Sequence, residues 1–126
     1  STWEGRTATL RPNPQVVDRF SDSHRALSIA RIECHYFVNN AFLDADQLLR
    51  DMPKIAHLPG LIVHGRYDVI CPLDNAYALH QAWPNSELQI IRDAGHAASE
   101  VGITDALVRG ADDMARRLLD LAPDEA

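Results

Sequence analysis

The stretch Leu61-Ile-Val-His-Gly-Arg-Tyr-Asp68 decides the class of fold. Its first five residues form a short apolar run that a glycine ends, which is typical of a buried parallel strand. A second strand is predicted at residues 87–91, after a helical segment that opens at Pro72 or Asp74 and closes at Pro84. A last amphipathic helix is predicted over residues 104–121. The order strand, helix, strand, helix predicts a right-handed parallel α/β unit.

The residues before this unit are expected to be helical or irregular, with no strand. Residues 1–18 are predicted to lack regular structure, because two prolines restrict the residues that precede them. A helix capped by one of residues 21–23 should run to Phe37 and break at Asn39-Asn40. A second helix should start at Asp44 or Asp46 and end before Pro53. Two strands are too few for a stable open sheet, so we expect part of a larger sheet to be missing.

Composition excludes several classes of protein. The 126 residues allow one domain, and 46% hydrophobic with 24% charged residues is ordinary for a globular chain. A net charge of −6 argues against nucleic-acid partners and against a polybasic membrane surface. No apolar run is long enough for a transmembrane helix or a signal peptide. Two isolated cysteines exclude a disulfide scaffold and suggest a reducing, cytoplasmic setting.

Two polar residues follow the predicted strands, at the edge of the sheet where open α/β proteins place reactive groups. Asp68 comes after the first strand and His96 after the second, 28 residues later. A carboxylate there could hold the imidazole Nδ1–H and leave the other nitrogen free as a base. The plainer alternatives are a turn-forming aspartate and an ordinary loop histidine. No metal site is predicted, because a set of His64, Asp68 and His96 has no supporting second shell in the sequence.

Longer strings point to a family. Those after residue 60 are Leu61-Ile-Val-His-Gly-Arg-Tyr-Asp68, Cys71-Pro72, Asn75-Ala76, Leu79-His-Gln-Ala-Trp-Pro84, Asp93-Ala-Gly-His96, Ser99-Glu100 and Gly102-Ile103. They closely resemble the C-terminal part of prolyl aminopeptidases (proline iminopeptidases), which are α/β-hydrolases of the serine peptidase type. Upstream, Trp3-Glu4 and Ala30-Arg-Ile-Glu-Cys-His-Tyr-Phe37 resemble that family's cap. The resemblance implies an α/β fold in which residues 53–126 are the C-terminal part of the hydrolase core, with its last two parallel strands. Residues 1–52 would be part of the helical cap.

The resemblance also implies roles for individual side chains. Asp68 would be the triad acid and His96 the general base. Glu4 and Glu33 would bind the free α-amino group of the substrate, which suits an enzyme that must recognise an ammonium. The competing interpretations are a surface charge for Glu4 and a solvated helix residue for Glu33.

Two further residues could line the substrate pocket. Phe37 lies four residues after Glu33, on the same helix face, and could contact a proline ring. Alternatively, Phe37 could be part of the hydrophobic core of the cap. Cys71 lies three residues after Asp68 and could line the pocket, or it could be a thiol without a role. It is not predicted to be the nucleophile.

The sequence has no G-x-S-x-G motif and no HGG-type loop, so it lacks a nucleophile and oxyanion donors. We therefore expect a cofactor-free C-terminal piece of a longer peptidase, inactive alone, whose partners are the missing N-terminal half and peptides with N-terminal proline. The exposed strand edge should make the piece self-associate. One alternative is a non-catalytic binding or subunit module. Another is half of an esterase or epoxide hydrolase, whose substrates have no amine for Glu4 and Glu33.

Overall fold

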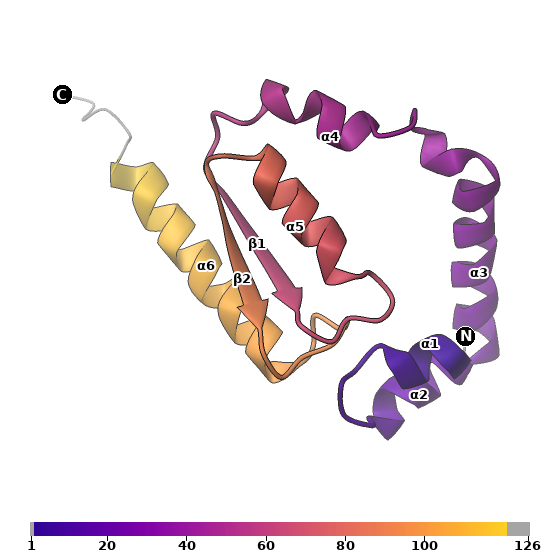
Figure 1. Cartoon of the computed structure of the whole chain (residues 1–126). Coiled ribbons are helices and arrows are strands. Elements are labelled where there is room, and N and C mark those ends of the chain that lie inside the picture. Colours follow the sequence, from indigo (N-terminus) through magenta and orange to yellow (C-terminus); the bar gives the residue numbers. More distant parts are fainter. Residues whose placement is uncertain (1, 121–126) are drawn as a thin grey trace.

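The computed structural model describes residues 2–120 and is an α/β arrangement with a helical N-terminal part (Figure 1). The strands β1 (Gly60–Gly65) and β2 (Ser86–Ile91) pair in parallel, with Gly60 opposite Ser86 and Gly65 opposite Ile91. The other elements are α1 (Thr2–Thr7), α2 (Pro14–Ser21), α3 (Ser23–Val38), η1 (Asn40–Phe42), α4 (Gln47–Asp51), η2 (Met52–Lys54), α5 (Leu73–Ala82) and α6 (Val101–Asp120). The predicted strands and the helix between them are confirmed, each strand being one residue longer than expected.

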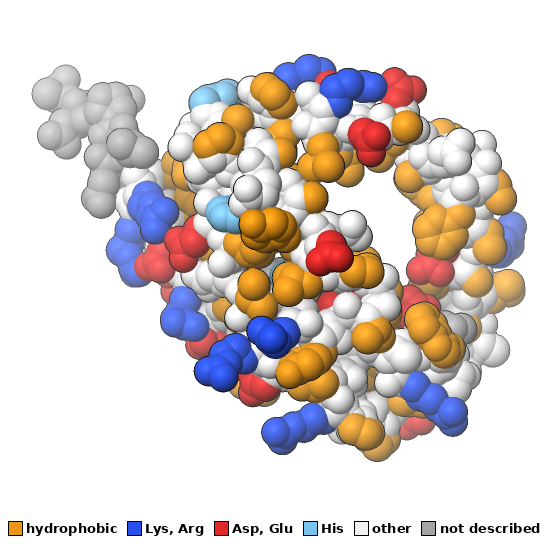
Figure 2. All heavy atoms as spheres, in the orientation of Figure 1, with side chains coloured by type: hydrophobic (Ala, Val, Ile, Leu, Met, Phe, Trp, Pro, Cys, Tyr) orange, Lys and Arg blue, Asp and Glu red, His pale blue; other side chains and the backbone are white. Residues whose placement is uncertain are grey.

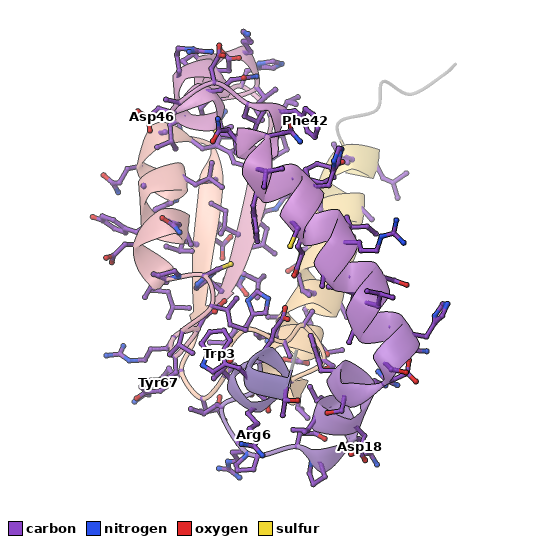
Figure 3. The ribbon with its side chains drawn as sticks, turned by 90° about the vertical axis from the view of Figure 1, so that its right-hand side faces the viewer. Trp3, Arg6, Asp18, Phe42, Asp46 and Tyr67 are labelled. Carbon is purple, nitrogen blue, oxygen red and sulfur yellow. The ribbon has the colours of Figure 1, made fainter. Side chains whose placement is uncertain are left out.

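The two strands lie between helices α5 and α6, so the small sheet is covered on both faces (Figures 1 and 3). Buried side chains sit at these contacts, among them Ala76 of α5 with Ile103 and Ala106 of α6. Helix α6 begins three residues earlier than predicted, at Val101. The expected last residue of that helix, Leu121, lies outside the described residues.

The prediction for residues 1–18 was wrong, because two helices occupy most of this stretch. Helix α2 starts at Pro14, and the Asn13 side chain accepts hydrogen bonds from the N–H groups of Gln15 (3.1 Å) and Val16 (3.3 Å). An asparagine cap followed by proline at the first helical position is a start signal. Reading the prolines only as restrictions on preceding residues concealed it. Helix α1 packs against α2.

Helix α3 begins and ends where the sequence indicates. The Asp22 side chain caps it by accepting from the Arg25 N–H at 2.9 Å, and the break at Asn39-Asn40 is confirmed. Residues 40–42 all have positive φ, which turns the chain sharply. Helix α3 packs against α2 and η1, and the space-filling view shows an opening between this limb and the sheet (Figure 2).

Much apolar surface is exposed. Phe37 is 73% exposed and Val101 is 86% exposed. None of the large side chains among residues 2–120 is fully buried. Within this part of the chain β1 pairs only with β2, so its other edge has no strand partner. The core is therefore small for the length of the chain, in line with the expectation from the strand count. Among the described residues no helix is long and apolar enough to cross a membrane.

Candidate active site

The structure brings Asp68 and His96 together at the carboxyl ends of the two strands. The His96 Nδ1–H donates to Asp68 Oδ2 across 2.9 Å. Because the strands are parallel and adjacent, the loops that follow them leave the same edge of the sheet and face each other. The His96 side chain is 38% exposed, and its Nε2 is not engaged by Asp68. The pair thus presents one imidazole nitrogen to whatever binds in front of it.

A tight turn orients the Asp68 carboxylate. Its Oδ1 accepts the N–H groups of Ile70 (2.9 Å) and Cys71 (2.8 Å), and the side chain is only 5% exposed. Burial alone would raise the pKa of Asp68. Hydrogen bonds from Cys71, His96 and Ile70 outweigh it and hold the pKa below its ordinary value. Asp68 is therefore ionised at neutral pH and can stabilise an imidazolium at His96.

A second histidine supports the same turn. His64, in β1, has Nε2 at 3.0 Å from the Cys71 carbonyl oxygen and 3.8 Å from Asp68 Oδ2. Since a carbonyl only accepts, Nε2 carries the proton and donates to Cys71. This is the local polar contact expected of a histidine at the end of a strand. Its link to the Asp68 turn could not be read from the sequence.

The two loops are pressed together behind the pair. A Cβ on Gly65 would lie 1.9 Å from the carbonyl oxygen of Gly95, so only glycine fits at this position. The Tyr67 N–H donates to the Ala94 carbonyl at 3.0 Å, and the Arg66 N–H donates to that of Ile91 at 2.9 Å. These contacts fix the spacing of the Asp68 and His96 loops before any side chain interacts.

Cys71 lies beside the pair. One ligand atom from each of Asp68, Cys71 and His96 falls within 4.8 Å of the others, and all three residue types can bind zinc. Desolvation and then the charge of Asp68 raise the pKa of the Cys71 thiol, so it is protonated at neutral pH. The two Asp68 oxygens already accept three hydrogen bonds. The arrangement suits a proton-transfer pair better than a metal centre, and it does not activate Cys71 as a nucleophile.

The other site residues predicted from the sequence lie on the N-terminal helices. Glu4 is half-buried on α1, and its carbonyl accepts the Ala8 N–H at 2.8 Å. The carbonyl of Ala8, the residue directly after α1, accepts the His96 N–H at 3.0 Å. The C-terminal end of α1 therefore lies next to the His96 loop.

Glu33 and Phe37 are on α3, half-buried and exposed respectively. In the described part of the chain, no side-chain hydrogen bond or ion pair joins Glu33 to Asp68 or His96. Phe37 is 73% exposed in this chain. The structure therefore brings together Asp68, Cys71 and His96, and it leaves Glu33 and Phe37 on α3, a separate limb.

Comparison with known proteins gives clear relatives. No protein-family model matches the chain. It is 53% identical over 116 residues to a proline iminopeptidase of Xanthomonas citri, covering 91% of this chain and 37% of that protein. It is 51% identical over 107 residues to one of Arabidopsis thaliana, covering 84% and 28% of the two chains, and 42% identical over 118 residues to one of Neisseria gonorrhoeae, covering 93% and 36%. The chain therefore closely resembles part of the proline iminopeptidases, and it spans at most 37% of the length of these three relatives.

Proposed function

We propose that this chain is the C-terminal portion of a serine aminopeptidase of the α/β-hydrolase fold that releases proline from the N-terminus of peptides. The observation that carries the proposal is the 2.9 Å hydrogen bond from His96 Nδ1 to a buried Asp68 carboxylate. It lies at the carboxyl edge of two parallel strands, where an acid–base pair for acyl transfer is expected. The names of the relatives suggest the substrate class.

In this proposal His96 Nε2 is the general base. It takes the proton of a serine hydroxyl as that oxygen attacks the carbonyl carbon of the N-terminal proline, and then gives the proton to the leaving amine. Asp68 stays ionised and stabilises the imidazolium between these steps. None of the six serines of this chain lies in a G-x-S-x-G turn, so the nucleophile comes from another part of the protein.

Residues 1–52 form part of a cap over the site in this proposal, and residues 53–126 belong to the core. Glu4 and Glu33 bind the α-ammonium of the substrate, since paired carboxylates favour a cation and exclude internal peptide segments. Phe37 is exposed one helical turn from Glu33 and contacts the proline ring. Cys71 lines the pocket next to Asp68.

The test compares the full-length protein that contains this sequence with the 126-residue chain. The full-length protein should hydrolyse a proline arylamide, the chain alone should not, and His96→Ala should abolish turnover. His57→Ala is a matched control, because His57 precedes β1 at the opposite end of the sheet. Retained activity in His96→Ala would contradict the role of His96. If the purified 126-residue chain hydrolysed the substrate by itself, the proposal that the nucleophile lies outside this chain would be wrong.

A further inference from the structure

Glu100 contacts Leu10, which lies 90 residues before it in the sequence, and also Gly95. Its Oε1 accepts the N–H of Gly95 at 2.6 Å, and its Oε2 accepts the N–H of Leu10 at 3.0 Å. The residue is half-buried and lies directly before helix α6. One carboxylate therefore ties the residue before His96 to the segment between α1 and α2.

The same segment holds His96 from a second side. The carbonyl of Ala8, a residue that is 2% exposed, accepts the N–H groups of His96 (3.0 Å) and Ala97 (2.7 Å). A Cβ on Gly95 would lie 3.1 Å from the Leu10 nitrogen and 3.2 Å from Glu100 Oε1. The backbone of residues 95–97 is thus enclosed by hydrogen bonds with almost no free space around it.

We infer that Glu100 is a positioning residue for His96, acting through the backbone of residues 95–97 and the segment 8–10. The inference rests on the proposed function of His96 as a general base. Asp68 fixes the orientation of the imidazole ring, whereas Glu100 and the Ala8 carbonyl fix the position of the His96 Cα atom. Both are needed, because small displacements of a catalytic group are costly in rate.

The hydrogen bonds that hold residues 95–97 also connect them to helix α1. The Ala8 N–H donates to the carbonyl of Glu4, and the Ala8 carbonyl accepts from the N–H of His96. A single residue therefore separates the helix that carries Glu4 from the base. Hydrogen bonds of Ala8 and Glu100 therefore link the helix that carries Glu4 to the loop that carries His96.

The chemistry of the carboxylate gives the test its variants. Glu100→Gln keeps the size of the side chain but has one acceptor oxygen and an NH₂ donor, so one of the two N–H groups loses its partner. Glu100→Leu removes both acceptors. Glu87→Gln is the matched control, because Glu87 is an exposed residue of β2 whose side chain contacts Gln89 and Arg117 away from the site.

In the full-length protein, Glu100→Gln should lower kcat roughly 10- to 100-fold with KM near that of the wild type, which is the cost of a displaced catalytic group. Glu100→Leu should lower it further, and Glu87→Gln should not change it. Amide hydrogen exchange at residues 95–97 should become faster, with protection elsewhere retained. The low-field Nδ1 proton resonance of the His96–Asp68 bond should broaden.

Two results would overturn the inference. One is a Glu100→Gln protein with wild-type kcat and wild-type exchange at residues 95–97. The other is loss of protection throughout the protein together with a lower Tm, which would make Glu100 a general stabilising residue. If even the wild-type protein has no aminopeptidase activity, the proposed function fails. The exchange and Nδ1 resonance measurements then still decide whether Glu100 positions His96.

Discussion

Replacing Asp68 by Asn tests the acid–base pair most directly, because the structure constrains how the amide can bind. In the wild type Oδ1 accepts two backbone N–H groups, and Oδ2 accepts the Nδ1–H of His96. An asparagine that keeps its oxygen on the Ile70 and Cys71 N–H groups must turn its NH₂ toward His96. His96 Nδ1 then has to accept, and the ring proton moves to Nε2.

The expected magnitude follows from this change of tautomer. With Nε2 protonated, the nitrogen that should take the serine proton is no longer a base. In serine peptidases the corresponding substitution lowers kcat by roughly 10⁴. That factor corresponds to about 5.5 kcal/mol in the activation free energy. The opposite rotamer of the asparagine would face its NH₂ toward two backbone donors, which costs both of those hydrogen bonds.

Two measurements check the prediction. Hydrolysis of a proline arylamide by full-length Asp68→Asn should show the loss in kcat, with a smaller change in KM. Nitrogen NMR of His96 should show the proton on Nδ1 in the wild type and on Nε2 in the variant. An unchanged tautomer with unchanged kcat would refute the argument that Asp68 orients the imidazole.

Four further predictions concern binding and stability. Glu33→Gln should raise KM for substrates with a free amine through loss of about 1.5–3 kcal/mol of charge-assisted binding, and should leave neutral esters almost unaffected. An equal effect on both would make Glu33 structural. Gly65→Ala should lower the free energy of unfolding by about 3 kcal/mol, measured in urea, because the new Cβ meets the Gly95 carbonyl. The pKa of Asp68 is lowered from 3.8, so its stabilisation is present above that pH and is lost as pH falls further. The Tm difference between wild type and Asp68→Asn should therefore shrink in acid. The 126-residue chain should self-associate through the open edge of β1, and a monomer in sedimentation at high concentration would contradict this.

Local patterns were sufficient for the parallel unit. An apolar run ended by glycine predicted β1, residues 87–91 were predicted to be the second strand, and prolines marked the ends of α5. The meeting of Asp68 with His96 followed from topology, since parallel neighbours release their loops at one edge. The same reasoning failed near the N-terminus, where the prolines predicted no regular structure although Asn13-Pro14 starts α2.

Long-range contacts of the backbone explain what the sequence could not predict. Ala8 acts on His96 through a carbonyl oxygen, which every residue possesses, so its identity carries no signal. Glu100 stands in a string that resembles the family, but its acceptors reach Gly95 and Leu10 only in the folded chain. The separation of α3 from the sheet depends on the positive-φ turn at residues 40–42. No sequence rule predicted the direction in which the chain leaves this turn.

The geometry of His96 has three supports, and they act on different parts of the residue and its loop. Asp68 sets the rotation of the ring, the Ala8 carbonyl sets the backbone at His96, and Glu100 sets the residue before it. All three lie within this chain. If His96 is the base proposed above, its orientation does not depend on the part of the protein that would supply the serine, and a preformed imidazole lowers the entropic cost of assembling the catalytic group. Loss of any one support should leave the histidine present but displaced, and kcat should fall before substrate binding weakens.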